Sequence, residues 1–552
     1  MPLPPTLARV LGLAALLACA RPPPPPAPRV ADPVPAAAWH RGAVVYGVVP
    51  PLLVSRPGES PLAAVTAHLD ALADLGVDVL WLAPVTATDD PGAISYAVTD
   101  LFALRPDYGT PAELRALVRE AHARRMRVVL DLVASHTSTG HPFYRDAEAR
   151  GRASPWWAFY ERGPDGEARY DFDWKHLRRL DYANPAVRRM VSDACALWVR
   201  DYDVDGFRFD AAWAVKDRAA DFWPALVKDL RAQKPGLLLL AEASARDPYW
   251  IASGFDAAYD WTAELGHGAW EHAFDDPRRV APALDAALAA RATPMDRVLR
   301  FLGNNDTGAR FVTRHGPALT RVAAVLEHTL PGLPLVFTGE ETGAAYEPYA
   351  DPAPLDGRDP SGLRPLYRRL AALREQLPAL RDGLYRRARV TEGGAPSEAV
   401  FAFQRDAGEA GRALVVLNFG PAPARVELEI PGAPGPAPAF DALAERAEPA
   451  RAVDARTVAL ELPPTSARVL VDGPPLTPGV GRWRAPPRAG VEGLPATPRT
   501  RAPAGPGSPR RAPPRAAPRP RARSRGSARA GTGAWCGRAP RSSGSSATSS
   551  AA

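Results

Sequence analysis

The sequence lacks the features that mark several classes of protein. It has three cysteines in 552 residues (Cys19, Cys195 and Cys536), too few for a disulfide-dense scaffold or a cysteine zinc cluster. No apolar run reaches the ~18 residues that span a bilayer, which excludes a polytopic membrane protein. Neither a Gly-x-Gly-x-x-Gly after the first predicted strand nor a Walker sequence is present, so the nucleotide-binding folds lose their main support. The composition that remains is globular, with 46% hydrophobic and 23% charged residues, and is rich in proline.

Positive charge is concentrated at the C-terminus. Residues 481–552 contain 15 Arg, no Lys and one acid, Glu492, for a charge of +14, whereas the whole chain carries +7. Residues 1–480 therefore carry −7, and we expect no nucleic-acid partner for the folded part. Residues 474–552 lose all hydrophobic periodicity and are predicted to form a disordered Arg/Pro/Ser-rich tail. Binding of an acidic polymer and an out-of-frame reading of a GC-rich gene are the alternatives for this tail.

The N-terminal segment resembles an export signal. Residues 1–19 contain a short apolar segment and end in Leu16-Leu17-Ala18-Cys19, which is similar to the bacterial lipobox. We predict lipidation at Cys19, followed by a Pro-rich linker over residues 20–38. The expected location is the cell envelope, on the periplasmic or outer surface, with membrane contact only through the lipid anchor. A plain secretory signal, giving a periplasmic or secreted protein, is the alternative.

Apolar runs of strand length alternate with amphipathic helical segments between residues 43 and 377. One predicted helix starts at Thr110, which caps it together with Glu113, and another starts at Asn184-Pro185. Eight alternating strand and helix units favour a closed (β/α)8 TIM barrel, with an open doubly wound sheet as the alternative. The predicted strands are residues 44–48, 77–82, 128–133, 204–209, 237–241, 255–259, 298–302 and 333–337.

The pattern also predicts how the chain is divided. The barrel is expected over residues 39–380, and residues 137–179 form an insertion after the third strand. Short runs of alternating apolar and polar residues follow, which predict a C-terminal all-β sandwich over residues 385–473.

Acidic residues follow three of the predicted barrel strands. Asp210, Glu242 and Asp306 stand at the C-terminal ends of strands four, five and seven, where barrel enzymes carry their chemistry. Arg208 shares a strand face with Asp210 and is expected to keep it ionised, whereas the apolar setting of Glu242 predicts a raised pKa. Such a pair suits glycoside hydrolysis, and the spacing of ~4.7–4.9 Å between adjacent strands favours the retaining geometry. Each acid alone could instead cap a strand or form a structural salt bridge.

Four segments together resemble the α-amylase superfamily, glycoside hydrolase family 13. They appear in the family's order and at its strand positions, and the resemblance covers about residues 40–472. The segments are Asp131-Leu132-Val133-Ala134-Ser135-His136, Gly206-Phe207-Arg208-Phe209-Asp210, Ala241-Glu242-Ala243 and residues 301–306.

The resemblance implies roles for the charged residues. Asp210 would be the nucleophile that forms a covalent glycosyl-enzyme, and Glu242 would protonate the leaving oxygen and then activate water. Asp306 would hold sugar hydroxyls and favour the distorted ring of the transition state. Arg208 would orient and ionise Asp210.

The resemblance also implies a substrate-binding set. His136 would hydrogen-bond the sugar in subsite −1, and Tyr96 would stack on its ring. Asn305 stands where the family usually has histidine, so it can donate to sugar hydroxyls but carries no charge. Ser135 stands where the family often has a calcium-binding asparagine, and we therefore expect a calcium-independent fold with no metal or organic cofactor.

Aromatic residues accompany these motifs without a settled role. The insertion resembles the family's domain B, which walls one side of the cleft. Four of its aromatic residues form either the core of that small domain or further sugar subsites, and the same alternative applies to Trp213. These four residues are Trp156, Trp157, Phe159 and Tyr160.

The sequence therefore predicts a retaining α-glycosidase that hydrolyses α-1,4-glucosidic bonds of glucans or maltooligosaccharides by double displacement. An α-glucan transglycosylase or trehalose-forming relative would use the same intermediate and differ in how well water is excluded. A non-catalytic sugar-binding protein on the same scaffold is the remaining alternative. We expect a monomer with an α-glucan or oligosaccharide as substrate.

Overall fold

The computed structural model describes residues 39–262, 265–289, 293–350, 353–431, 438, 440–448 and 450–473. All of these except Trp39 lie in one structural unit. The predicted signal with Cys19, the linker 20–38 and the tail 474–552 lie outside the described residues. Within the described residues, none of the helices has the length and apolarity needed to cross a bilayer.

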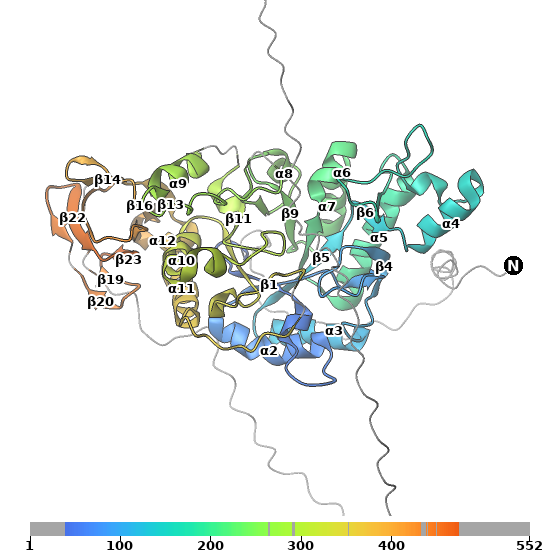
Figure 1. The fold of residues 1–552 in the computed structure, drawn as a ribbon, viewed down its shortest axis with the longest axis horizontal. Coiled ribbons are helices and arrows are strands. Elements are labelled where there is room, and N and C mark those ends of the chain that lie inside the picture. Colours follow the sequence, from blue (N-terminus) through green and yellow to red (C-terminus); the bar gives the residue numbers. More distant parts are fainter. Residues whose placement is uncertain are drawn as a thin grey trace, which may run out of the picture. The chain divides into compact units, whose positions relative to one another are not determined.

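Eight parallel strands close into a barrel (Figure 1), which confirms the predicted fold class and excludes the open sheet. Each strand pairs with its neighbours in chain order, and the last pairs with the first: Val45 lies opposite Leu335. The strands are β1 (Val45–Val48), β2 (Val79–Leu82), β5 (Arg127–Val133), β8 (Gly206–Asp210), β9 (Leu238–Ser244), β10 (Ala257–Tyr259), β11 (Val298–Phe301) and β12 (Leu333–Phe337).

The strands that carry the two carboxylates end at or beyond their predicted ends. The ladder between β5 and β8 runs to the pair Val133 and Asp210, so Asp210 is the last residue of β8, as its predicted shared face with Arg208 requires. Strand β9 continues further than predicted, through Glu242 to Ser244. A strand-held side chain is fixed more firmly than one on a loop.

Helices surround the barrel, and two begin at the predicted caps. Thr110 with Glu113 forms a capping box at the start of α3, and Oδ1 of Asn184 accepts a hydrogen bond from Ala186 N at 2.9 Å at the start of α5. The helices are α2 (Pro61–Leu75), α3 (Pro111–Ala123), α5 (Pro185–Tyr202), α6 (Ala212–Arg218), α7 (Phe222–Gln233), α8 (Tyr249–Ala252), α9 (Val280–Ala289), α10 (Phe311–Thr329), α11 (Arg364–Gln376) and α12 (Pro378–Asp382), with short 3-10 turns at η1 (Pro50–Leu53), η4 (Met295–Arg297), η5 (Glu340–Thr342) and η6 (Gly408–Ala410).

Two smaller elements lie between barrel strands and carry parts of the site. After β2, β3 (Thr86–Thr88) pairs with β4 (Val98–Leu104) as an antiparallel hairpin. After β5, an insertion is framed by the antiparallel strands β6 (His136–Ser138) and β7 (Leu177–Arg179). Between these two strands lie α4 (Pro142–Arg150) and the 3-10 turns η2 (Gly151–Ala153) and η3 (Trp157–Phe159).

The aromatic residues of the insertion pack on one another. The rings of Phe143 and Trp156 stack with centroids 3.6 Å apart, and Phe159 meets both edge-on. The guanidinium of Arg162 lies 3.4 Å from the ring centroid of Trp157. Phe159 and Tyr160 are buried and Trp156 packs against Phe159, so the core alternative holds for these three residues.

Two antiparallel sheets follow the barrel. Their facing sides share a buried apolar cluster that includes Val416, Val426 and Val458, which makes a sandwich. Arg405 of β16 donates to Thr329 O at 2.6 Å, at the end of α10, and so ties the sandwich to the barrel. The first sheet contains β13 (Leu384–Arg387), β16 (Val400–Asp406), β17 (Arg412–Asn418), β23 (Ser466–Val471), β19 (Phe440–Asp441) and β20 (Arg446–Ala447), and the second contains β15 (Ala395–Pro396), β14 (Arg389–Glu392), β18 (Ala424–Glu429), β22 (Thr457–Leu462) and β21 (Arg451–Ala452).

Candidate active site

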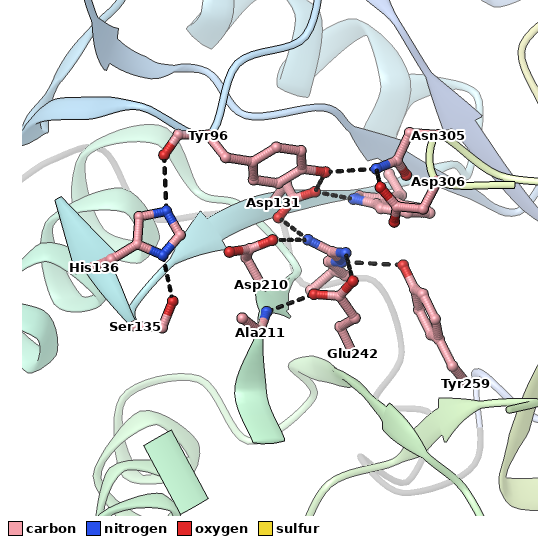
Figure 2. Close-up of polar contacts among 12 residues, drawn as sticks. Tyr96, Asp131, Ser135, His136, Asp210, Ala211, Glu242, Tyr259, Asn305 and Asp306 are labelled. Carbon is pink, nitrogen blue, oxygen red and sulfur yellow. Dashed lines mark hydrogen bonds and ion pairs between the residues drawn. The ribbon is translucent and has the colours of Figure 1, made fainter. Parts of the chain in front are cut away.

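A single buried guanidinium joins carboxylates from three barrel strands (Figure 2). Arg208 of β8 is 0% exposed. Its Nη1 lies 2.8 Å from Oδ1 of Asp131 and 3.0 Å from Oδ1 of Asp210. Its Nη2 forms an ion pair with Oε1 of Glu242 at 3.0 Å, and its Nε donates to the hydroxyl of Tyr259 at 3.0 Å. The arginine therefore fixes the positions of Asp210 and Glu242 relative to each other.

The strand pattern explains why Arg208 and Asp210 point into the barrel. Phe207 and Phe209 alternate with them, are fully buried, and pack outward, where the ring of Phe209 lies 4.8 Å from that of Trp223 on α7. Successive side chains of a strand point to opposite faces, so the two polar residues share the inner face.

A hydrogen-bond chain connects Asp306 to this cluster from the far side of the barrel. Nδ2 of Asn305 lies 2.9 Å from Oδ1 of Asp306, 2.9 Å from the hydroxyl of Tyr349 and 3.1 Å from the hydroxyl of Tyr96. Tyr349 donates to Oδ1 of Asp306 at 3.0 Å, and Tyr96 donates to Oδ2 of Asp131 at 3.1 Å. Asn305 therefore uses its amide nitrogen to position neighbours, and its buried Oδ1 has no hydrogen-bond partner among the described residues.

His136 borders the site at the start of β6. Its Nδ1 lies 2.7 Å from Oγ of Ser135, and its Nε2 lies 3.1 Å from the carbonyl oxygen of Tyr96. Burial lowers the pKa of His136 to about 4. The imidazole is therefore neutral at neutral pH and acts as a hydrogen-bonding group rather than a cation.

The carboxyl cluster is short of positive charge. Burial, followed by the charge of Glu242, raises the pKa of Asp210 well above its ordinary value, although Arg208 opposes this. Burial likewise raises the pKa of Asp131 to about 6 and that of Asp306 to about 7. The expectation that Arg208 favours the ionised form of Asp210 holds in direction, because Arg208 lowers this pKa, but burial and Glu242 act against it and one guanidinium serves several buried acids. Such a cluster retains a proton near neutral pH, which glycoside hydrolysis requires for its acid step.

The residues near Ser135 do not fit a calcium ion. The Ser135 hydroxyl is engaged with His136, and the Ser135 carbonyl accepts from Nη2 of Arg218 at 3.2 Å. Arg218 also donates from Nε to Ala214 O at 2.8 Å, so its positive charge lies between the insertion and α6. A guanidinium at this point disfavours a second cation. Across the described ranges, no group of three or more His, Cys, Asp or Glu could hold a metal ion.

The structure places the barrel residues that were predicted from the sequence in one site. Four residues that were not predicted as site residues also lie there. The added residues are Trp81, which donates to Oδ2 of Asp131 at 3.2 Å, together with Asp131, Tyr259 and Tyr349. Asp131 lies inside one of the four family segments, and the alternation of β5 indicates its inward position. Tyr349 lies in the loop after β12, where no periodic signal points to it.

Comparison with known proteins gives the family. Residues 56–365 match the family model for the alpha amylase catalytic domain. The chain belongs to the α-amylase family. It is 32% identical over 405 residues to the alpha-amylase MalA of Haloarcula japonica, an alignment that covers 72% of this chain and 58% of that protein. It is 27% identical to a cyclomaltodextrinase of Geobacillus thermopakistaniensis over 62% of this chain and 60% of that one. The chain thus spans somewhat more than half the length of these two curated relatives.

Solved structures of α-amylase relatives share the fold. An α-amylase from Geobacillus thermoleovorans, complexed with acarbose, superposes with a TM-score of 0.64 at 23% identity, over 78% of this chain and 98% of that one. A debranching enzyme of Nostoc punctiforme gives a TM-score of 0.65 at 21% identity, over 79% of this chain and 99% of that one. The barrel and the sandwich of this α-amylase-family chain are therefore those of known family members.

Proposed function

We propose that this α-amylase-family chain is a retaining α-glycosidase that hydrolyses α-1,4-glucosidic bonds of glucans or maltooligosaccharides. The observation that carries the proposal is the shared guanidinium, from which Asp210 and Glu242 each lie 3.0 Å away. Two carboxyls held so close favour direct attack on the sugar over the wider gap that an inverting enzyme needs for its water. The acarbose complex of the Geobacillus thermoleovorans enzyme also supports an oligosaccharide substrate.

In the first step, Asp210 attacks the anomeric carbon. Arg208 occupies its Oδ1, which leaves Oδ2 as the attacking atom. Glu242 transfers its proton to the glycosidic oxygen, so the aglycone departs as an alcohol while a glycosyl ester forms on Asp210. In the second step, the Glu242 carboxylate takes a proton from water, and the resulting attack on the anomeric carbon releases Asp210.

The other polar residues bind the sugar between these acids. Asp306 is held by Asn305 and Tyr349, and we assign it the hydroxyl groups of the reacting sugar. To hydrogen-bond the sugar, Nε2 of neutral His136 exchanges the Tyr96 carbonyl, 3.1 Å away, for a sugar hydroxyl. The ring of Tyr96 provides a stacking surface.

We also propose that the fold is independent of calcium. The support is Arg218, whose guanidinium holds the carbonyls of Ser135 and Ala214 in the place that Ser135 marks as the family's calcium position. An organic cofactor has no part in the double-displacement mechanism.

On the basis of residues 1–19 alone, we propose that the chain is exported and is anchored to the membrane by a lipid on Cys19. Expression of the full chain in a bacterium, followed by detergent phase partitioning, tests this. The wild type should enter the detergent phase and Cys19→Ser should not; equal partitioning of the two would contradict the anchor. Size-exclusion chromatography of the same material tests the proposed monomer.

The stereochemistry of the products tests the proposed function. The full chain is incubated with maltotetraose and followed by proton NMR. Shorter sugars should appear first as α-anomers, and Asp210→Asn should abolish them. Initial β-anomers would refute the retaining mechanism, and longer oligomers would show that transfer exceeds hydrolysis.

A further inference from the structure

The loop that carries Asp306 is held from behind by a buried arginine. This loop, residues 302–310, joins β11 to α10, and Arg310 is its last residue. The side chain of Arg310 is 2% exposed, and its Nη1 lies 3.3 Å from the carbonyl oxygen of Asn304 in the same loop. Because a buried charge is costly unless it is paired and hydrogen-bonded, the groups around this guanidinium have to hold it in place.

The contact made by Arg310 reaches Asp306 through one residue. Oδ1 of Asn304 accepts a hydrogen bond from Asp306 N at 2.9 Å. The hydroxyl of Thr307 accepts from Asn304 N at 3.0 Å and donates to Asn304 O at 3.2 Å. A Cβ atom at Gly303 would crowd the guanidinium, at 3.2 Å from Nη1 of Arg310. The loop is therefore shaped around Arg310 and fixes the backbone of Asp306.

Glu340 supplies the charge partner of Arg310 from the neighbouring loop. Glu340 is the first residue of η5, shortly after β12, and its Oε2 forms an ion pair with Nη2 of Arg310 at 3.3 Å. Its Oε1 accepts from the hydroxyl of Tyr367 on α11 at 3.0 Å. The guanidinium also lies 5.0 Å from the ring centroid of Phe337, the last residue of β12. Because β11 and β12 are paired, the ion pair joins the loops that follow two adjacent strands.

We propose that Arg310 and Glu340 are positioning residues that set the place of Asp306 in the active site. The carboxylate of Asp306 is held on the substrate side by Tyr349, and its backbone is held from behind through the Arg310 pair. An error of about 1 Å in the placement of such a group can cost roughly 10²-fold in rate. The inference rests on the proposed glycosidase function and adds to it the residues that hold the third acid.

The charge of Glu340 depends on pH near neutrality. Burial raises the pKa of Glu340 to about 7, although Arg310 and Tyr367 lower it. Glu327 of α10 is fully buried, and burial together with the charge of Glu340 raises its pKa well above the ordinary value. Glu327 therefore keeps its proton at neutral pH, and Glu340 carries the negative charge beside Arg310 above about pH 7. The titratable and charged groups around Glu340 are Arg310, Tyr367, Glu341, Glu327 and Tyr346.

Substitution of Arg310 by lysine tests the positioning role in the full chain. Arg310→Lys keeps a positive charge, but its single ammonium group cannot hold both Glu340 and the Asn304 carbonyl. The kcat for maltotetraose should fall by roughly 10²-fold while KM changes by less than about three-fold, because Asp306 is assigned to the distorted ring of the transition state.

Arg374→Lys is the matched control. Arg374 of α11 is also 2% exposed and donates to two backbone carbonyls, those of His328 at 2.6 Å and Gly332 at 2.7 Å. This variant should lower the melting temperature and keep kcat. An equal fall in kcat in the Arg310 and Arg374 variants would overturn the proposal.

A double-mutant cycle shows whether Arg310 acts through Asp306. The substrate is α-maltosyl fluoride, whose activated leaving group keeps the rates of weakened variants measurable. In the Asp306→Asn background, Arg310→Lys should lower kcat/KM by less than about two-fold, because the group that it positions has lost its function. A general loss of structure would lower the rate by the same factor in both backgrounds, and that result would overturn the proposal.

Glu340→Gln tests the contribution of the negative charge. Glutamine has nearly the shape of protonated glutamate, so the variant imitates the acid form of Glu340 at every pH. Its kcat should be roughly ten-fold below that of the wild type at pH 8 and within about two-fold of it at pH 5.5, where Glu340 of the wild type is itself protonated. The same ratio at both pH values would overturn the role of Glu340.

Hydrogen exchange keeps the test independent of turnover. The amide of Asp306 donates to Asn304, so exchange measured by mass spectrometry should be faster for residues 302–309 in Arg310→Lys than in the wild type, and unchanged there in Arg374→Lys. This result supports the positioning of the loop even if the wild type has no glycosidase activity and the proposed function fails. Equal exchange in Arg310→Lys and the wild type would overturn the proposal.

Discussion

Replacement of Asp306 by asparagine should stabilise the fold while it abolishes activity. Burial raises the pKa of Asp306 from 3.8 to about 7, the charge of Glu242 adds to the rise, and Arg208 and Tyr349 oppose it. A carboxyl whose pKa is raised on folding supports the folded state only at low pH, and that support is lost as pH rises from the unfolded to the folded pKa. At about 1.36 kcal/mol per pKa unit, ionised Asp306 destabilises the fold by up to about 4 kcal/mol above pH 7.

The variant removes this penalty and keeps the local hydrogen bonds. Asparagine retains an oxygen that can accept from Tyr349 and Asn305. The free energy of unfolding should therefore rise by roughly 2–4 kcal/mol at pH 8, by less than about 2 kcal/mol at pH 5, and by almost nothing below about pH 4. Urea unfolding followed by circular dichroism at several pH values measures this dependence.

Asp217→Asn is the control for the unfolding measurement. It changes an exposed carboxylate of α6 and should show no such pH dependence. If Asp306→Asn is less stable than the wild type at pH 8, or if its advantage grows toward acid, the reasoning about shared charge is wrong.

Three further predictions concern the same cluster and its surroundings. Arg208→Lys keeps the charge, but the single ammonium group cannot reach three carboxylates at once. The loss of two charge-assisted hydrogen bonds of about 1.5–3 kcal/mol each should lower kcat/KM by roughly 10²–10⁴-fold. A loss below about ten-fold would contradict this expectation. Tyr349→Phe removes a donor that lowers the pKa of Asp306, so the acidic limb of the pH–rate profile should move to higher pH, and an unmoved limb would exclude the positioning role. Removal of calcium with EDTA should leave the melting temperature unchanged because Arg218 supplies the positive charge beside Ser135, and a fall of several degrees would reveal a bound ion.

The barrel could be read from the sequence because its strands are buried on both faces. Runs such as the one in β12 are continuously apolar, and caps such as Thr110 mark where helices begin. The alternation of β8 predicts its end at Asp210 and the face that Asp210 shares with Arg208. Strand β9 runs past Glu242 to Ser244, further than its apolar run predicts, because polar residues that face the barrel axis look like the start of a loop.

The electrostatics of the site could not be read in the same way. A single arginine two residues before Asp210 predicts an ionised carboxylate, but the pKa of Asp210 also depends on its burial and on the charges that the fold gathers around it. Burial is the largest cause that raises this pKa, followed by Glu242, and Asp131 and Asp306 add to the rise that Arg208 opposes. Tyr349 reaches Asp306 from a loop whose position only the closed barrel defines.

The central claim is that Asp210 forms a covalent bond to the sugar. The full chain is treated with 5-fluoro-α-maltosyl fluoride, which slows release of the intermediate, and is then digested and analysed by mass spectrometry. We predict a glycosyl adduct on the peptide that contains Asp210, with no adduct in Asp210→Asn. An adduct on another residue, or the same labelling in Asp210→Asn, would contradict the account.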